Sequence, residues 1–484
     1  MSIPHHAPDP QACFVRTMIS RLLLACWPSI LPLMQFGCGD DSVQPDRLLS
    51  VSLTPADSTI FVGDAVVYEA KAHYESGTRQ PDSVTWAVSN PDVLRLTSEA
   101  DGRAEVTGIA RGESYISATV DGLTDGSLAM VVHVGDVRWV ADVRGSTYAG
   151  PALDAHGRVY VVGGEDLSAV SPLGQVLFSV PYCNWSELSG SVLPDGTAYT
   201  TGNSCVQQHS SEGSLVWQFD DGGTRKGGVA VTSSGGVTFL DTGGVYLIRL
   251  SVMGTELWRS PIAASALDQP AIAPAIASNG DTYVPWDSSS SDSRLSRVAS
   301  DGTLLWTVAT SGRVRFASPA LADNRIVLGY SSGGVAVFDT TGALLWEQYW
   351  GSNGVSSPVI DGAGNIYVQS RSALVSYDVG GTPRWTADSL ASDAPIGIGA
   401  PTLLSNGQLV VECGGEVCTV NVADGSLVWR SNTEAYVFGS PAVAPEGSIH
   451  VQSSEGLVTL WGRTPPLKEG WPTEGGCMGR LRRQ

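Results

Sequence analysis

The chain has 484 residues, and 28 Lys and Arg stand against 48 Asp and Glu, which gives a formal net charge of −20. Nucleic acids and anionic membranes bind basic surfaces, so this balance excludes both as electrostatic partners. Charged residues make up only 16% of the chain, against about 25% in a typical soluble protein, and there are 56 Gly and 14 Trp. Low charge with many Gly and Trp is typical of short strands joined by tight turns, and we expect an all-β protein.

The N-terminal region carries an uncharged, mostly apolar stretch over residues 22–37, after Arg16 and Arg21. The stretch is shorter than the roughly 20 residues that a membrane-spanning helix needs. A basic start followed by a short apolar run is typical of a secretory signal. We therefore predict a signal peptide over residues 1–37, with Met18 as an alternative start.

The end of this stretch, Gly37-Cys38, resembles the signal of bacterial lipoproteins, in which the Cys becomes the lipidated first residue of the mature chain. The resemblance implies a lipid on Cys38, membrane contact through that lipid alone, and a place in the cell envelope, in the periplasm or on the outer membrane. Gln35 and Phe36 depart from the family pattern, so secretion without a lipid stays open. Residues 38–48 are short and polar, as in a tether.

Residues 49–135 alternate apolar and polar positions in short runs separated by turn residues, which predicts an antiparallel β-sandwich. Three phrases, Val62-Gly63-Asp64, Trp86-Ala87-Val88-Ser89-Asn90-Pro91 and Gly108-Ile109-Ala110-Arg111-Gly112, resemble the bacterial Ig-like group 2 domain. The resemblance implies a spacer or adhesin module rather than an enzyme.

The remaining residues form a repeat in which one aromatic recurs at intervals of 39 to 48 residues. Most of these aromatics end a Gly-x-x-x-Trp phrase, and a small residue, Pro and an apolar pair follow 12 to 16 residues later, as in Ser357-Pro358-Val359-Ile360. The eight intervals predict eight units with room for about four strands each. The recurring positions are Trp139, Phe178, Trp217, Trp258, Trp306, Trp346, Trp385, Trp429 and Trp471.

A four-stranded unit cannot bury both of its faces alone, and radial packing of neighbouring units buries them. The repeat therefore predicts an eight-bladed β-propeller over residues 136–484, with the recurring aromatics wedged between adjacent blades. The Gly–Trp phrase resembles the quinoprotein-type repeats shared by quinoprotein dehydrogenases and by the lipoprotein propeller of the outer-membrane barrel assembly machine. The resemblance implies the fold strongly and the function weakly, because propellers host many functions.

Residues suited to catalysis or metal binding show no pattern that we can assign to a known site. No two Cys are adjacent, as they usually are in quinoprotein dehydrogenases, and His156, His209 and His450 share no metal-ligand spacing. Asp-rich turns such as Asp361-Gly362-Ala363-Gly364-Asn365 recur at equivalent repeat positions, which favours tight-turn chemistry, with calcium as the alternative. We predict a protein without catalytic activity, cofactor or metal, and a quinone- or metal-dependent enzyme is the alternative.

Four cysteines are predicted to form disulfides in an oxidising compartment. Cys413 and Cys418 flank a predicted four-residue hairpin loop, and Cys183 and Cys205 lie within one repeat. Cys477 has no predicted partner.

Insertions fall in the connections between units and in the middle hairpins, which emerge on the same face of an up-and-down blade. Aromatics outside the repeat register fall in the same places, and we predict that they form a binding face; the alternative is that they cover blade edges or fill the channel. The predicted function is a scaffold that binds an envelope protein or a glycan, with the sandwich as spacer, and an assembly factor similar to the barrel-machine propeller is the alternative. The face residues are Tyr182, Trp185, Trp286, Tyr349 and Trp350.

Overall fold

The computed structural model describes most of the chain after residue 45. The described ranges are 46–143, 150–163, 165–183, 190–202, 204–222, 227–241, 245–263, 272–289, 292–314, 317–350, 354–371, 373–390, 399–431, 433–469 and residue 473. Within these ranges nearly all regular structure is β, in agreement with the expectation from composition, and a single 3₁₀ turn, η1 (Asp388–Leu390), is the helical element. None of the described residues belongs to a helix of the length and apolarity that crossing a membrane requires.

The first nine strands form a two-sheet β-sandwich. One sheet has the order β1-β3-β7-β6, with β4 paired to β3, and the other has the order β2-β9-β8-β5, in which β2 runs parallel to β9. The strands are β1 (Leu48–Thr54), β2 (Asp57–Phe61), β3 (Ala65–Tyr74), β4 (Gly77–Arg79), β5 (Thr85–Val88), β6 (Leu94–Ala100), β7 (Arg103–Gly108), β8 (Gly112–Val120) and β9 (Leu123–Val132).

Alternation along these strands builds the core of the sandwich. In β8 the side chains of Ser114, Ile116, Ala118 and Val120 are buried, while those between them are exposed or half-buried, because successive side chains of a strand point to opposite faces. Trp86 is 7% exposed and packs in the core cluster that both sheets share, as a residue between two sheets should.

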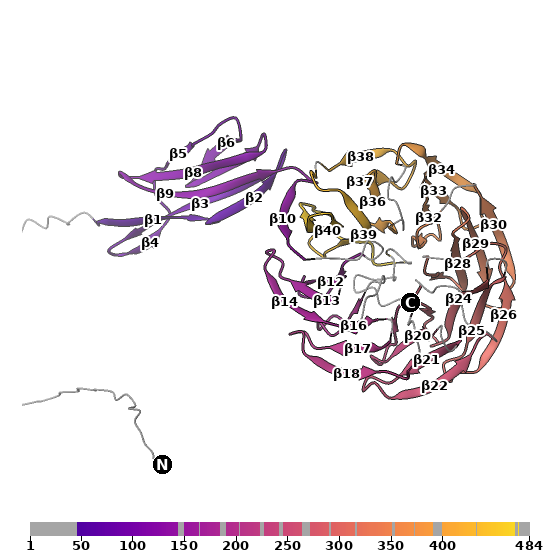
Figure 1. The fold of residues 1–484 in the computed structure, drawn as a ribbon. Coiled ribbons are helices and arrows are strands. Elements are labelled where there is room, and N and C mark those ends of the chain that lie inside the picture. Colours follow the sequence, from indigo (N-terminus) through magenta and orange to yellow (C-terminus); the bar gives the residue numbers. More distant parts are fainter. Residues whose placement is uncertain are drawn as a thin grey trace, which may run out of the picture.

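From residue 137 onward the described strands form eight four-stranded antiparallel sheets, which Figure 1 shows arranged as a ring. This ring confirms the predicted β-propeller. In chain order the strands of the first four sheets are β11 (Ala152–Leu153), β12 (Val159–Gly163), β13 (Asp166–Val170), β14 (Val176–Pro181); β15 (Ser191–Val192), β16 (Ala198–Thr201), β17 (Val206–His209), β18 (Leu215–Phe219); β19 (Ala230–Val231), β20 (Val237–Asp241), β21 (Tyr246–Leu250), β22 (Glu256–Pro261); β23 (Ala275–Ile276), β24 (Thr282–Ser289), β25 (Asp292–Val298) and β26 (Leu304–Ala309).

Three of the other four sheets follow the same order, from a short inner strand to an outer strand, and the last one has a longer inner strand, β39, and takes β10 as its outer strand. Their strands are β27 (Ala320–Ala322), β28 (Arg325–Tyr330), β29 (Gly334–Asp339), β30 (Leu344–Tyr349); β31 (Val359–Ile360), β32 (Ile366–Gln369), β33 (Leu374–Tyr377), β34 (Pro383–Ala387); β35 (Thr402–Leu403), β36 (Gln408–Cys413), β37 (Glu416–Asn421), β38 (Leu427–Arg430); and β39 (Val437–Val443), β40 (Ile449–Ser453), β41 (Gly456–Leu460) with β10 (Val137–Ala141).

The last sheet closes the ring with strands from both ends of the propeller. Strand β10 pairs antiparallel with β41 and is the outer strand of this sheet, although it precedes every other propeller strand in sequence. Closure removes the open end that a linear array of sheets would expose. Trp139 therefore lies in the last sheet of the ring, and Trp471 lies outside the described residues.

Burial falls from the inner strands of each sheet to the outer one. All five residues of β12 and of β20 are buried, because neighbouring sheets cover both faces. The outer strands are half-buried or exposed at most positions, as in β18 and β30. Side chains from two sheets meet in common clusters: Leu153 and Val159 pack with Leu457 across the closure.

The sandwich contacts the propeller close to β10 (Figure 1) through exposed charged groups. Arg463 donates to both carboxylate oxygens of Asp64 at 2.9 Å, and its guanidinium lies 5.6 Å from the centre of the Phe61 ring. Arg111 lies 3.6 Å from Asp136. An exposed ion pair such as that of Arg463 with Asp64 contributes about 0–1 kcal/mol.

Candidate functional site

The repeat aromatics of the described residues all lie in outer strands, and each contacts the next sheet through a glycine. In all eight contacts the glycine begins the Gly-x-x-x-aromatic phrase of the next sheet. A Cβ added to Gly381 would lie 2.5 Å from the Trp346 ring, and one added to Gly135 would lie 2.9 Å from the Trp429 ring across the ring closure. The contacts are Gly135–Trp429, Gly174–Trp139, Gly213–Phe178, Gly254–Trp217, Gly302–Trp258, Gly342–Trp306, Gly381–Trp346 and Gly425–Trp385.

Most of the indoles are also hydrogen-bonded to the sheet that they contact. The Nε1 of Trp346 donates to the carbonyl of Val379 at 3.2 Å, and the Nε1 of Trp385 donates to that of Val422 at 2.9 Å. The aromatics thus occupy the position between sheets for which their size and single donor suit them.

A β-bulge stands immediately before each of these aromatics. In β30, for example, Trp346 pairs with Val337 and Leu344 pairs with Phe338, so that Leu345 has no partner in β29. A bulge turns two consecutive side chains outward and interrupts the edge of the strand.

The bulges expose a recurring apolar pair on the outside of the ring, which we name the outer rim. Leu344 and Leu345 are each 46% exposed, and β34 differs, since Pro383 and Arg384 occupy the same two positions. The sequence carries this signal as an apolar pair before the repeat aromatic, which was not among the predicted binding residues. The outer rim consists of Val176 and Leu177, Leu215 and Val216, Leu304 and Leu305, Leu344 and Leu345, and Leu427 and Val428.

The predicted binding face of off-register aromatics is wrong for two of its five residues. Trp286 and Tyr182 are each 5% exposed. The insertion near Trp286 lengthens the strands β24 and β25 instead of forming a loop, and the indole packs with Leu240 and Ile262 of the preceding sheet. Its Nε1 donates to Ser296 Oγ at 2.8 Å, so the ring belongs to the core.

Of the other three predicted face residues, Tyr349 and Trp350 are neighbours at the end of β30. Tyr349 is 48% exposed, at the end of β30, and stacks on Tyr330. Trp350 is half-buried and stacks on Tyr377 of the next sheet at 6.0 Å. Trp185 lies outside the described residues.

Two disulfides link Cys413 to Cys418 and Cys183 to Cys205, each with the Cα atoms 5.9 Å apart. The hairpin at Cys413 differs from the predicted one. Cys413 pairs with Glu416 across a two-residue Gly414-Gly415 turn, so the bridged cysteines are diagonal neighbours rather than opposite each other. Cys38 and Cys477 lie outside the described residues.

No three His, Cys, Asp or Glu side chains of the described ranges gather as metal ligands would. His209 and His450 are buried in different sheets, and His156 is largely exposed in a turn. In the turn at Asp361 the carboxylate accepts hydrogen bonds from the backbone N–H groups of Ala363 and Asn365, which is the arrangement of an Asx turn.

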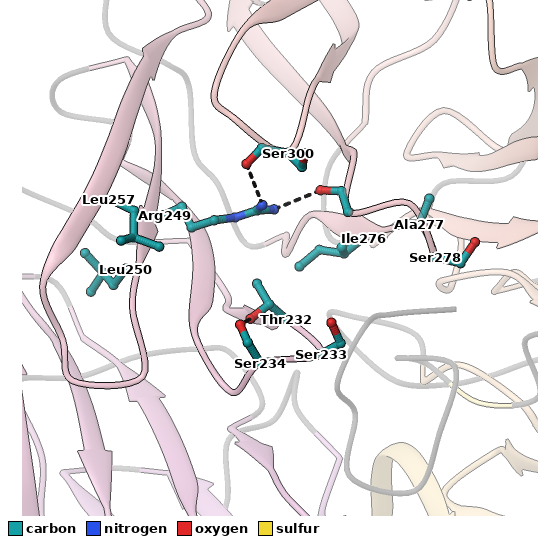
Figure 2. A pocket seen from close by; sticks show the side chains of 11 residues that line it. Thr232, Ser233, Ser234, Arg249, Leu250, Leu257, Ile276, Ala277, Ser278 and Ser300 are labelled. Atoms are coloured by element: carbon teal, nitrogen blue, oxygen red, sulfur yellow. Dashed lines mark hydrogen bonds between the residues drawn. The ribbon is translucent and has the colours of Figure 1, made fainter.

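A cavity of about 250 Å³ lies between the third and fourth sheets, at the face where the turns are short. Figure 2 shows Arg249 among the side chains that line it, with Thr232 and Ser234 on one side of the guanidinium and Ser300 on the other. Arg249 is 7% exposed, and burial lowers the pKa of its guanidinium. The lining combines Ser and Thr hydroxyls with apolar side chains such as Leu250 and Ile276.

Every hydrogen bond that Arg249 donates within the described residues ends on a neutral oxygen. Its Nε and Nη2 donate to the hydroxyls of Thr238 and Thr282 at 2.9 Å, and its Nη1 and Nη2 donate at 3.1 Å to the carbonyls of Ser300 and Gly280. Arg249 is not among the residues that the sequence patterns single out. The signal that the sequence offered is the Gly235-Gly236 turn before β20. The residue in the place of Gly236 in the next repeat is polar, Asp281.

Comparisons with known proteins agree with the fold. The chain is similar to BamB from Moraxella catarrhalis (16% identity, TM-score 0.53, covering 67% of this chain and 99% of that one). It is also similar to the C-terminal WD40 domain of Sif2 (11%, 0.54, 67% and 97%) and to the Dos1 propeller (12%, 0.53, 69% and 97%). At these identities the likeness shows the propeller fold alone. A search of curated proteins found no match.

A family model matches residues 202–393 and again residues 291–471, so that the two matches span 270 of the 484 residues. They include the sheets that carry most of the Gly–Trp contacts and the cavity at Arg249. The chain therefore belongs to the PQQ_2 family, whose model is described as outer membrane protein assembly factor BamB.

Proposed function

We propose that this protein is a non-catalytic scaffold of the cell envelope that binds extended apolar segments of outer-membrane proteins during their assembly. The observation that carries the proposal is the outer rim, a pair of exposed apolar side chains that recurs at the same position in five outer strands. Exposed apolar groups on a rigid frame are a common basis of protein–protein recognition. Membership of a family described as an assembly factor supports the same class of function.

The frame that presents the rim is held by contacts between sheets. Each rim pair directly precedes an aromatic that packs on the next sheet, so the rim residues cannot move independently of the ring of sheets.

We propose that the eight sheets are the blades of an eight-bladed propeller, that the sandwich is an Ig-like spacer, and that a lipid on Cys38 anchors the chain to the envelope.

The partner's chemistry follows from the bulges. A bulged outer strand interrupts the backbone pattern that an added strand would need, which favours binding through side chains. The strands of outer-membrane barrels alternate apolar and polar residues, so an unassembled strand presents an apolar row to such a surface. The acidic charge of the chain favours segments with few acidic residues.

A rim variant built from the protein's own sequence tests this proposal. We would replace Leu344 by Gln and Leu345 by Arg, which places at this bulge the Arg that β34 carries as Arg384. The probe is a labelled ten-residue peptide of alternating apolar and polar residues, followed by fluorescence anisotropy. We expect binding to the intact protein and at least tenfold weaker binding after the same exchange has been made at all five rim pairs.

The matched control replaces exposed polar residues in the neighbouring turns, such as Thr341→Ala, and should leave affinity unchanged. A peptide of the same composition with its apolar residues grouped in one block should bind more weakly. Equal binding of the alternating peptide by the intact protein and the five-pair variant, with both melting alike, would overturn the proposed function.

A further inference from the structure

The cavity at Arg249 contrasts with the equivalent place in the next sheet. Arg249 pairs with Trp258 across β21 and β22, and Arg297 pairs with Trp306 across β25 and β26. In both, Nη1 and the indole donate to the same carbonyl of the following sheet, that of Ser300 in the first case and that of Thr340 in the second. The two arginines are thus structural equivalents.

The two arginines differ in their counter-charge. Arg297 forms an ion pair with Asp281 at 2.6 Å through Nη2, and its Nε also donates to this carboxylate. Asp281 is the residue before β24, and Gly236 is the residue before β20 in the sheet of Arg249. A Cβ on Gly236 would lie 2.4 Å from the carbonyl oxygen of Leu250, so the third sheet has no room for a carboxylate there.

A buried guanidinium without a carboxylate is a binding determinant, because taking a charge out of water costs free energy that neutral acceptors offset only in part. Four of the five N–H groups of Arg249 donate to the described residues, and one N–H of Nη1 does not. Asp281 lies near enough to act on the pKa of Arg249, but Arg297 already neutralises it.

The cavity beside Arg249 matches one kind of ligand. Thr232, Ser233 and Ser278 supply hydroxyls that can donate to an anion, while Leu257 and Ile276 form an apolar wall. Its volume of about 250 Å³ is below the roughly 300–1,000 Å³ of sites for drug-sized ligands. The volume of the cavity therefore favours a small ligand whose anionic end and aliphatic end lie close together.

We propose that this cavity binds an aliphatic carboxylate, with the carboxylate on Arg249 and the hydroxyls and the aliphatic part on Leu257 and Ile276. The ligand is either a small free acid or the C-terminal carboxylate of a peptide that ends in an aliphatic residue. The site lies at the turns of two sheets and does not depend on the outer rim.

The indole of Trp258 provides the readout, because its Nε1 shares the Ser300 carbonyl with Arg249 and its ring lies 4.9 Å from the guanidinium. The experiment uses the full chain with ¹⁵N-labelled Trp. Isovalerate is titrated against its neutral isostere isovaleramide, and acetyl-Gly-Leu against its C-terminal amide. The indole of Trp385, which donates to Val422 in another sheet, is the internal control.

We expect isovalerate to shift the Trp258 indole resonance and to leave that of Trp385 in place, whereas isovaleramide moves neither. Arg249→Met, which keeps the unbranched apolar stem of the side chain and removes its charge, should weaken binding at least tenfold. A shift with acetyl-Gly-Leu as well assigns the site to peptide ends, and a shift with isovalerate alone assigns it to small acids.

The proposal is overturned if acid and amide act alike on Trp258, if neither carboxylate moves it, or if Arg249→Met keeps the affinity. Should Arg249→Met not fold, the comparison of acid with amide on the unaltered protein decides the matter alone.

Discussion

Gly381 lies directly under the indole of Trp346, and the Nε1 of that indole donates to the carbonyl of Val379, two residues before the glycine. One turn thus provides both the space and the acceptor for the aromatic of the preceding sheet. The same relationship recurs around the ring and explains why Gly and Trp are spaced together in the sequence.

Gly381→Ala should destabilise the protein by more than a substitution at a comparable open glycine. Gly381 has φ of 85°, and an added Cβ would lie 2.5 Å from Cδ2 of Trp346. The left-handed backbone alone costs an Ala about 1–2 kcal/mol, and overpacking adds about 1–3 kcal/mol. Gly407→Ala is the control, since its φ is 76° and its nearest neighbour would be 3.6 Å away. Equal losses in chemical unfolding would contradict the contact.

Trp286→Ala should lower stability as strongly as Trp306→Ala. The register of the sequence suggests that Trp286 is a surface residue, but its burial at 5% and its bond to Ser296 make truncation a cavity-forming change. Removing a large buried aromatic costs about 3–5 kcal/mol. Thermal unfolding of both variants measures this, and a Trp286→Ala protein that melts like the wild type would show that the ring is dispensable.

The bridge between Cys413 and Cys418 should be found by peptide mapping without reduction. Because the closed loop is short, we expect the double variant Cys413→Ser, Cys418→Ser to lose about 2 kcal/mol. Both side chains are buried, at 1% and 0% exposure, so alkylation of the native protein should be negligible. Quantitative alkylation of both thiols under native conditions is the result that contradicts the bridge.

The stability of the protein should decrease as the pH is lowered below about 6.5, in part because of His450. Burial and the nearby charge of Arg138 lower the pKa of His450 from its ordinary value of 6.5 to about 3. The unfolded state then binds the proton first, so its contribution to stability is complete above about pH 6.5 and is lost as pH falls toward 3. His450→Gln should flatten the dependence of the melting temperature between about pH 6.5 and 4.5, where few carboxylates titrate. A His450→Gln protein whose melting temperature falls as steeply over this range as that of the wild type would contradict the role of His450.

Membrane attachment should depend on Cys38. We expect Cys38→Ala to move the protein from the membrane to the soluble fraction and to abolish incorporation of labelled palmitate, because the lipid is the proposed anchor. Palmitate labelling that persists in this variant would place the lipid elsewhere or remove it from the proposal.

Local sequence patterns were sufficient to predict the repeating unit of this fold. The glycine and the aromatic of each phrase recur at 39 to 48 residues because every sheet repeats the same contact with its neighbour, so spacing and composition were enough to predict an all-β propeller. The sequence alone also identified the aromatics that lie between sheets, since size and a single donor suit them to that position.

Contacts between sheets decided the rest. Nine recurring aromatics do not say which sheet holds the first, and only the pairing of β10 with β41 places Trp139 in the last sheet. The extra residues near Trp286 could form either a longer loop or longer strands, and the sequence does not distinguish the two. In the structure they lengthen the strand β24, and the Trp286 indole packs with Leu240 and Ile262. Whether Arg249 has a counter-ion depends on the residue before the adjacent strand and on the backbone that leaves Gly236 no room for a side chain. These features arise from residues far apart in the chain, and local patterns do not encode which of them meet.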